Sequence, residues 1–469
     1  MVAVTGPPVG DALADAEPAA FWPDRTPVAP RAPLPGSESA DLVVVGAGLT
    51  GLWTAVLAKQ RDPELDVLVL EAGRVGSGGS ARSGGFLSES LTHGLAHGAQ
   101  LWPAEIGALV ELGRRNLREI GEFVESEGID ADLRWCGKTA VATEPHQVGE
   151  LRDEADLYRE HGFPAVFQGA GGVRADLRSD SFRAGLRLPD AGGLVDPAKL
   201  VGGLVAAAER LGVRVHERSP VGSVRSRGGG LRLRCPQGTV RARRAVLATN
   251  AFPAPLRRLR RRVLPIWDYV LVTEPLSAAA WDSLGWHDRQ GVTDSHNLFH
   301  YFRPTPDGRI LWGGGAAEYY FGGRTAPALA ARPEPHRRLA TTFFATFPQL
   351  EGTRFSHRWG GPIDATTRST PVFGTALAGR VAYAAGFTGL GVAASRFGGQ
   401  VVLDLLAGAA TERTRCALVR TRPLPYPPEP LRWPLVRATH RALERADAAA
   451  GERGRWLRLL DRHGLGLGS

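Results

Sequence analysis

Three glycines and one glutamate have the types and spacing needed to bind the phosphates and ribose of a dinucleotide. Gly46, Gly48 and Gly51 form a Gly-x-Gly-x-x-Gly motif, and Glu71 follows 20 residues after the last of them. The first glycine permits a tight turn, the second lets a pyrophosphate approach the backbone, and the third lets a helix pack on its strand. The helix N-terminus stabilises the phosphate charge, and the carboxylate accepts hydrogen bonds from the ribose hydroxyls. The motif predicts a dinucleotide site but does not separate a nicotinamide from a flavin cofactor.

Two later loops favour the flavin. Residues 74–86 form a long segment of small residues directly after the acidic residue, where its amides, Ser80, Ser83 and Arg82 can contact phosphate or a flavin ring. Residues 384–392 form a second glycine-rich turn at the start of a helix, which can stabilise negative charge on a reduced flavin ring. A simple NAD-dependent dehydrogenase leaves both loops unexplained.

Regular elements must hold these loops in place. The β-branched run Leu42–Val45 is typical of a buried parallel strand, residues 52–60 of a helix, and Asp66–Leu70 of a second buried strand. Val381–Ala385 is predicted to be a late strand before the second turn. A further group of strands is expected at Trp267–Val272, Phe299–Arg303 and Ile310–Trp312, with a hairpin turn at residues 304–308.

These elements predict an α/β fold: a Rossmann-like domain that binds the dinucleotide, an α+β substrate domain with a mixed, largely antiparallel sheet, and a helical C-terminal tail. The boundaries that we expect are an N-terminal arm at 1–40, a discontinuous dinucleotide-binding domain at 41–100, 191–265 and 355–415, a substrate domain at 101–190 and 266–354, and the tail at 416–469. Phe21 and Trp22 are candidates to anchor the arm.

Together these motifs resemble the D-amino-acid oxidase superfamily. The resemblance rests on Val43–Gly51, Glu71, Gly79–Gly85, Trp359–Pro362 and Tyr383–Gly391, and within the superfamily the chain is most similar to the glycine/sarcosine oxidase and gamma-glutamylputrescine oxidase branch. The resemblance implies bound FAD. The FAD contacts that it implies, together with the residues of the first motif, are Gly46, Gly48, Leu49, Thr50, Gly51, Glu71, Ala72, Arg74, Ser80, Ala81, Arg82, Ser83, Gly84, Gly85, Val221, Thr249, Asn250, Gly386, Thr388, Gly389, Leu390 and Gly391.

The resemblance also implies a reaction. A C–N bond beside the flavin is oxidised by hydride transfer, the imine is released, and dioxygen is the expected electron acceptor. The substrate is expected to be a small amine or amino acid, and the candidate catalytic or substrate-lining residues are His93, His300, Tyr301 and Trp359. Arg303 can pair with a substrate carboxylate or form a structural ion pair.

The chain departs from the family at positions near the flavin ring and the substrate. Leu390 stands where histidine is frequent, and Gly315-Ala316 stands where the branch often carries Tyr-Asp. Sarcosine oxidases attach their flavin through a cysteine, but residues 358–362 contain none. We therefore expect noncovalent FAD, with more change on the substrate side than on the cofactor side.

The composition argues against several other classes of protein. The formal net charge is +9, yet the arginines are mostly dispersed and no aromatic-interleaved module supports nucleic-acid binding. No apolar run is long enough for a membrane span, and no secretion signal is evident. Three scattered cysteines predict neither a disulfide framework nor a metal site and favour the cytoplasm. The arginine-rich tail is either a clasp on the body, which we favour, or a membrane-surface helix.

Two other functions stay open. One is a flavoenzyme of specialised metabolism that oxidises or desaturates an amine-bearing intermediate. The other is a flavin-binding protein without amine turnover. The sequence does not indicate the oligomeric state.

Overall fold

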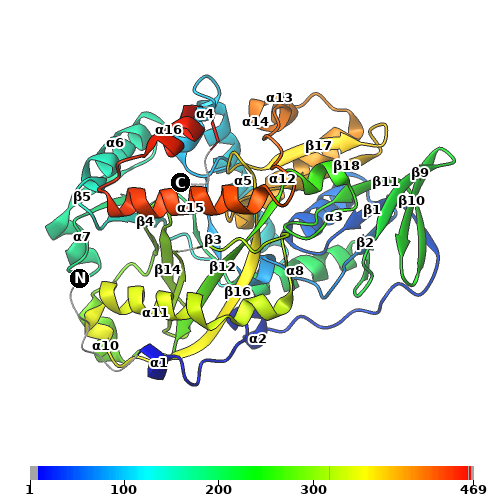
Figure 1. The fold of residues 1–469 in the computed structure, drawn as a ribbon. Helices are drawn as coiled ribbons and strands as arrows, with labels where there is room; N and C mark the ends of the chain where they lie inside the picture. Colours follow the sequence, from blue (N-terminus) through cyan, green and yellow to red (C-terminus); the bar gives the residue numbers. More distant parts are fainter. Residues whose placement is uncertain (1–8, 316, 463, 466–469) are drawn as a thin grey trace.

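The computed structural model describes residues 9–315, 317–462 and 464–465, which form two large sheets with helices around them (Figure 1). The predicted α/β fold class is confirmed, and the domain boundaries given above stay a prediction. Ala316, one of the departures from the family, lies outside the described residues.

The first sheet has the strand order β17-β18-β11-β1-β2-β8. Its centre is parallel, with Val44 of β1 beside Val69 of β2 and Val246 of β11. These β-branched residues are buried because helices cover one sheet face and other strands cover the opposite face. The strands are β1 (Glu38–Val45), β2 (Val67–Leu70), β8 (Arg214–His216), β11 (Gly238–Leu247), β17 (Val372–Ala376) and β18 (Val381–Ala385), and the antiparallel hairpin β9 (Ser223–Arg227) and β10 (Gly230–Cys235) extends from β11.

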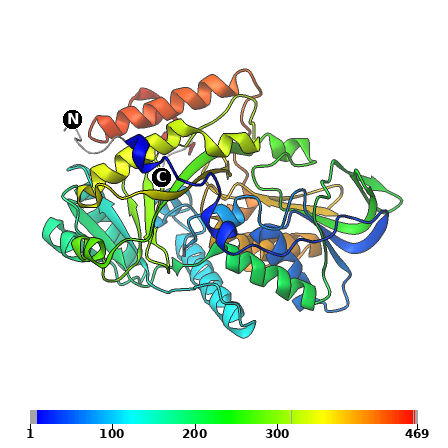
Figure 2. The same cartoon turned by 90° about the horizontal axis from the view of Figure 1, so that it is seen from below.

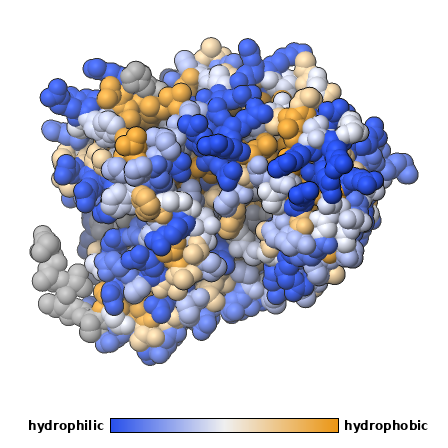
Figure 3. All heavy atoms as spheres, turned by 45° about the vertical axis from the view of Figure 1, so that its right-hand side comes forward, coloured by the Kyte–Doolittle hydropathy of each residue, from blue (hydrophilic) through white to orange (hydrophobic). Residues whose placement is uncertain are grey.

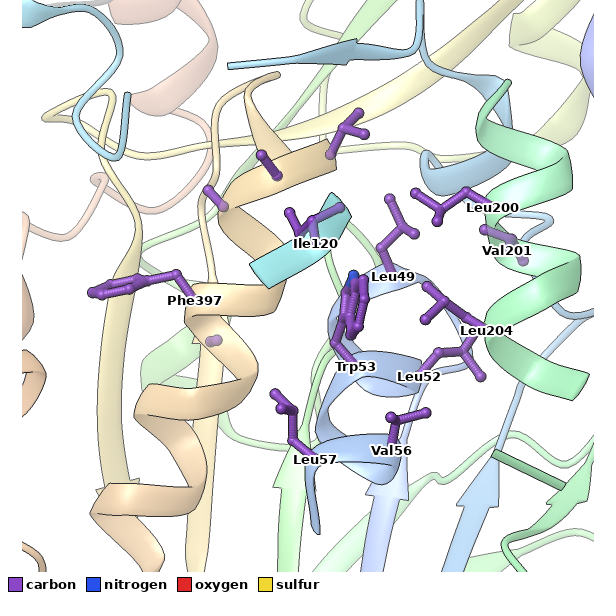
Figure 4. Close-up of a cluster of buried hydrophobic side chains, with 14 of the residues drawn as sticks. Leu49, Leu52, Trp53, Val56, Leu57, Ile120, Leu200, Val201, Leu204 and Phe397 are labelled. Atoms are coloured by element: carbon purple, nitrogen blue, oxygen red, sulfur yellow. The ribbon is translucent and has the colours of Figure 1, made fainter. Parts of the chain in front are cut away.

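Four helices pack together on one face of this sheet. Figure 4 shows Leu52 and Val56 of one helix on the side of Leu204 of a second helix. Trp53 points toward Ile120 of a third helix, and Phe397 comes from a fourth. This apolar contact fixes the helix that follows the glycine motif against the sheet. The helices are α3 (Leu49–Arg61), α5 (Ile106–Ser126), α8 (Pro197–Arg210) and α12 (Gly391–Ala407).

The second sheet has the order β16-β12-β15-β14-β13-β4-β6-β5, and all its pairs are antiparallel except β13 with β4. Its strands are β4 (Lys138–Ala142), β5 (Val166–Gly169), β6 (Ala184–Leu188), β12 (Leu264–Thr273), β13 (Gly291–Asp294), β14 (His300–Pro304), β15 (Ile310–Gly314) and β16 (Phe355–Ala365). The expected turn at 304–308 joins β14 to β15.

The two faces of this second sheet have different neighbours. Val270, Val272 and Leu311 belong to the same apolar cluster as the helices of the first sheet. The alternate residues, such as Leu271 and Trp312, pack with the helices on the other side. That outer side carries α10 (Ala278–Leu284) and α11 (Pro333–Thr346); α6 (Gln147–Glu160) and α7 (Ala170–Asp176) lie beside β5 and β6 (Figure 1).

The N-terminal arm is better ordered than the sequence indicates. Phe21 and Trp22 lie in α2 (Phe21–Arg25), and each is 2% exposed. Strand β1 begins at Glu38, three residues before the expected domain start, because Glu38–Ala40 pair with Val240–Ala242. Figures 1 and 2 show the arm running along the outside of the molecule from α1 (Val9–Ala12) to β1.

The C-terminal tail lies on the body as two helices, α15 (Arg432–Ala448) and α16 (Arg455–Arg462), and α15 forms an outer edge of the molecule in Figure 2. Leu443 and Leu457 form a buried cluster against Leu298. The Asp447 carboxylate accepts hydrogen bonds from the backbone and the side-chain amide of Asn297. The tail therefore fastens the loop before β14. The remaining elements are α4 (Leu95–Leu101), α9 (Arg257–Arg260), α13 (Glu412–Arg415), α14 (Ala417–Arg420), the short pair β3 (Phe86–Leu87) and β7 (Gly193–Leu194), and the 3-10 helices η1 (Ser80–Arg82), η2 (Pro327–Ala331) and η3 (Pro348–Leu350).

Candidate flavin and substrate site

The glycine motif forms a tight cradle at the carboxyl end of β1. Gly46 has φ +107°, and a Cβ there would overlap the carbonyl oxygen of Ala248 at the end of β11. A Cβ at Gly51 would overlap the carbonyl oxygen of Gly46. Both positions therefore require glycine for close backbone packing. Gly48 is different, because its Cβ would meet only the Ser80 hydroxyl, 2.7 Å away.

The start of α3 is open to an anion. Gly48 is the N-cap and provides no side-chain cap, so the Leu49 amide donates instead to Ser80 Oγ at 2.9 Å. The first amides and the dipole of a helix attract phosphate. Ser80 therefore brings the loop after Glu71 directly to the phosphate-binding end of the helix.

Glu71 is held beside this cradle by two backbone amides. Ala47 N donates to Glu71 Oε2 at 2.7 Å, and Gly73 N donates to Oε1 at 2.8 Å. Desolvation raises the pKa of Glu71, and these amide bonds oppose that rise. Each carboxylate oxygen can accept a further hydrogen bond, as ribose hydroxyls require. Of the neighbouring residues predicted to contact the cofactor, Ala72 and Arg74 are exposed, and Val221 is partly buried against the strand core.

The loop Arg82–Gly85 is fastened through its carbonyl groups. Trp359 Nε1 donates to Arg82 O at 3.0 Å, and Trp22 Nε1 donates to Ser83 O at 3.0 Å. Arg303 donates through one guanidinium nitrogen to Gly84 O at 3.2 Å and Gly85 O at 3.3 Å. Three buried side chains from distant parts of the chain thus bind four consecutive carbonyls. This arrangement fixes the backbone of the loop that is predicted to lie along the cofactor.

Polar groups around this loop fit an anionic cofactor. Desolvation lowers the pKa of Arg82, and its guanidinium has no carboxylate partner among the described residues. The Thr249 hydroxyl is buried, and no partner for it occurs in the described part of the chain. Asn250 approaches the loop, since its Nδ2 would lie 3.4 Å from a Cβ at Gly79. A cation without a counter-ion and an unpaired hydroxyl beside an open helix start are the groups that a bound pyrophosphate would satisfy.

The second glycine-rich turn is organised by an aspartate that the sequence analysis missed. The Gly386 amide donates to Asp364 Oδ2 at 2.5 Å, and the Thr388 amide donates to the Asp364 backbone oxygen at 3.2 Å. Burial raises the pKa of Asp364 to about 7. Leu390 is the N-cap of α12 and gives it no side-chain cap, so the first amides of α12 face the turn that contains Thr388 and Gly389. A carboxyl group near the end of β16, directly after Pro362 and Ile363, was the signal that could have identified Asp364.

Tyr301 faces the fastened loop and forms a pair with a second unpredicted aspartate. Its hydroxyl donates to Asp268 Oδ2 at 2.6 Å, and a Cβ at Gly84 would lie 2.8 Å from the Tyr301 ring. The phenol reaches Asp268 on β12 because Gly313, on the intervening strand β15, has no side chain. Asp268 shares its sheet face with Val270 and Val272, which is the face turned toward the first sheet.

Asp268 is partly exposed and has an unusual proton affinity. Desolvation raises the pKa of Asp268 to about 6, while the Tyr301 hydroxyl and the amides of Tyr269 and Gly314 stabilise its ionised form. Asp268 pairs with Gly361, where a Cβ would lie 3.8 Å from Arg82 Cδ. The carboxylate therefore borders the loop that contains Arg82. A charged residue in the middle of Leu264–Thr273, otherwise an apolar strand, was the available signal.

The structure separates the other predicted catalytic residues. His300 stacks on Trp312 on the opposite sheet face from Tyr301, because neighbouring strand residues alternate, and its Nδ1 lies 2.8 Å from Asp294 Oδ2. His93 lies near His97, with ring centroids 6.4 Å apart, and desolvation lowers the pKa of His93 to about 4. Trp359 is buried behind the loop that it supports. Tyr301 alone of the four combines a contact with the loop and a titratable partner; the catalytic roles of all four stay predictions.

The α/β fold with two large sheets and these cradles fit the class of dinucleotide-binding flavoproteins. Residues 41–405 match the DAO family of FAD dependent oxidoreductases, and the chain belongs to this family. The protein is therefore an FAD-dependent oxidoreductase. Among the described residues, no helix is both long and apolar enough to cross a membrane, and no group of three or more His, Cys, Asp or Glu side chains is arranged to hold a metal ion.

Relatives with assigned names support this placement. The chain is 30% identical to gamma-glutamylputrescine oxidoreductase of Escherichia coli K12, over 81% of this chain and 87% of that protein. It is 28% identical to a probable oxidoreductase, OrdL, of Haemophilus influenzae, over 80% of this chain and 85% of that protein. Its fold matches glycine oxidase from Geobacillus kaustophilus with a TM-score of 0.67 at 22% identity, covering 82% of this chain and 99% of that structure.

Proposed function

We propose that the protein oxidises a C–N bond in an amine or N-substituted amino acid, with noncovalently bound FAD and with dioxygen as electron acceptor. Bound FAD would supply the hydride acceptor. The names of two relatives, a gamma-glutamylputrescine oxidoreductase and a glycine oxidase, support an amine or amino-acid substrate. The observation that carries the proposal is the Asp268–Tyr301 pair on the sheet face beside Arg82 and Gly84.

Asp268 and Tyr301 bind and orient the substrate nitrogen in this proposal. With a pKa of about 6, the Asp268 carboxyl is mostly ionised at neutral pH and accepts an N–H from either a neutral or a protonated amine. Tyr301 keeps that carboxylate in one orientation through the 2.6 Å hydrogen bond. When the substrate nitrogen is fixed, the carbon next to it is held in one orientation for hydride transfer. Such positioning is what the protein contributes to the reaction.

The residues predicted from the sequence to bind FAD would each contact a different part of the cofactor. Ser80 and the first amides of α3 would hold the phosphate of FAD, Glu71 would hold its ribose, and the turn at 386–391 would hold its ring. Noncovalent attachment is supported by the cysteines: Cys136 lies in the loop before β4, Cys235 lies at the end of β10, and Cys416 lies beyond α12 with its thiol directed to Glu412 O at 3.2 Å. The three free cysteines also favour a reducing, cytoplasmic setting.

Anaerobic reduction of the flavin tests the proposal. The purified yellow holoprotein is mixed with primary amines, secondary amines and amino acids, and the absorbance at roughly 450 nm, the oxidised flavin band, is followed. We expect bleaching with a subset of amines, and peroxide after air is admitted. Bleaching without peroxide would assign a different electron acceptor.

Two controls make the result specific. Tyr301→Phe removes only the phenolic hydroxyl and should slow bleaching by an active amine. Acid precipitation should release all the flavin into the supernatant, and flavin in the pellet would contradict noncovalent binding. No bleaching with any amine would favour a flavin-binding protein without amine turnover.

A further inference from the structure

The outer face of the hairpin sheet at the edge of the molecule is an array of arginines. In the antiparallel register, Arg232 of β10 lies directly opposite Arg225 of β9 on one side and Arg241 of β11 on the other. Side chains of directly opposed residues point to the same face of the sheet. The side chains of residues i and i+2 of one strand also share a face. Arg227, Arg234 and Arg243 therefore extend the row. Arg243, at its inner end, pairs with Asp41; the other five form what we call the arginine face.

The opposite side of the same three strands is apolar. Val224, Leu231, Leu233, Val240 and Ala242 are buried against the first sheet. Along most of their length the strands thus alternate between buried apolar residues and solvent-facing residues, most of them arginine. Figure 1 shows β9 and β10 projecting at the edge of the molecule away from the second sheet, and Figure 3 shows hydrophilic side chains over much of this side.

The one acidic partner in the row, within the described part of the chain, is Asp41, which borders the arginine face and pairs with Arg243. Among the described residues, none of its five members has an ion-pair partner; the nearest such pair joins Arg243 to Asp41 at 3.3 Å. Like charges directly opposite each other destabilise a sheet. Positive charge on an edge strand can prevent edge-to-edge pairing, but that accounts only for Arg225 and Arg227 on β9, because β10 is paired on both sides. The arginines of β10 and β11 need another explanation.

The chemistry of the face favours a planar anionic partner. Residues 221–247 contain no aromatic side chain, so bases of single-stranded nucleic acid have no stacking platform. No large apolar side chain of these residues is exposed, so nothing there would enter a hydrocarbon layer. The hairpin tip is Gly228-Gly229, where a Cβ would meet nothing within 4 Å, so no bulky group blocks approach of the face to a flat surface.

We propose that the arginine face docks the protein on the surface of an anionic lipid bilayer, without insertion. Five guanidinium groups at one level of a sheet can contact lipid phosphates together, and Arg is suited to bidentate contact with phosphate. Each such side chain strengthens binding by about fivefold, and the attraction falls off within a Debye length. Docking is therefore reversible by salt.

Cosedimentation of the full-length holoprotein with lipid vesicles tests this. Vesicles contain phosphatidylcholine alone or with about 30% phosphatidylglycerol, to create a negative surface potential. The triple variant Arg225→Gln, Arg232→Gln, Arg241→Gln is compared with a control of equal charge, Arg437→Gln, Arg441→Gln, Arg445→Gln on exposed positions of α15. Flavin absorbance and the thermal midpoint verify that each variant is folded.

We expect the wild type and the α15 control to bind the anionic vesicles at low salt and to be released at high salt. The sheet variant should bind on the order of 100-fold more weakly, since three contributions are lost, and should be at least as thermally stable because like-charge repulsion is removed. Equal binding to neutral vesicles, equal loss in both variants, or loss only in the α15 control would overturn the proposal. Preferential binding of duplex DNA in competition with the vesicles would overturn the lipid as occupant.

Discussion

Replacing Asp268 with asparagine should make the protein more stable relative to the wild type at alkaline pH than at acidic pH, while it impairs amine oxidation. The native pKa of Asp268 is about 6, against an ordinary value of 3.8 in the unfolded chain. A raised carboxyl pKa means that the folded protein holds the proton more tightly than the unfolded chain does. Folding stability therefore falls as pH rises through this window and stays low above it.

The size of the effect follows from the shift. A difference of about two units corresponds to roughly 3 kcal/mol of unfolding free energy, of which about 1.4 kcal/mol develops between pH ~5 and pH ~8. Asparagine has the same shape and no charge, and the Tyr301 hydroxyl can rotate to accept from its amide. The variant should therefore gain stability relative to the wild type across that interval, whatever constant offset the substitution introduces.

Urea unfolding of both proteins at about pH 5 and pH 8 measures this change. The decisive quantity is how the difference between variant and wild type changes with pH. A difference that is the same at both pH values would refute the reasoning, because Asp268 would then not titrate as its surroundings require. In the same variant, kcat/KM for an active amine should fall about 10- to 100-fold, the value of one charge-assisted hydrogen bond.

Three other substitutions test the cofactor site. Trp22→Phe removes the indole N–H from Ser83 O and should weaken FAD binding about fivefold; an unchanged dissociation constant in a fluorescence titration would show that the loop holds itself. Gly48→Ala should lower the urea midpoint only slightly, because its Cβ displaces only the Ser80 hydroxyl and the hydrogen bond that it accepts from Leu49, yet should lose FAD on gel filtration; retention of FAD would remove the phosphate from this position. Asp364→Asn should abolish a pH-dependent change of the flavin absorbance with a midpoint near pH 7, set by the pKa of Asp364; the same titration in wild type and variant would assign it to another group.

The sequence was sufficient wherever chemistry is local. Gly46, Gly48, Gly51 and Glu71 belong to one strand–turn–helix–strand unit, so their spacing alone determines how they meet. The regular elements on both sides fix the loop between them. The turn that starts α12 was also predicted from its own residues, but Asp364, which holds it, comes from β16.

The substrate side depends on pairing between distant strands, which spacing does not reveal. Strand β15 lies between the strands of Tyr301 and Asp268. The two side chains meet only because β15 has Gly313, which has no side chain, at the position that the phenol crosses. His300 was the better candidate in the sequence, but strand alternation directs its side chain to the other face. The role of Trp22 depends on where the N-terminal arm lies, and no pattern within the arm indicates that position.

The carbonyl supports of the Arg82–Gly85 loop have a consequence for biosynthesis. Trp22 leaves the ribosome early, but Arg303 and Trp359 are synthesised much later. Strand β11, the neighbour of β1, lies between Trp22 and Arg303 in the chain. A nascent chain that already contains the glycine motif and Glu71 still lacks most of what holds this loop. Capture of FAD is thus coupled to completion of the polypeptide, and truncated chains should emerge without the cofactor.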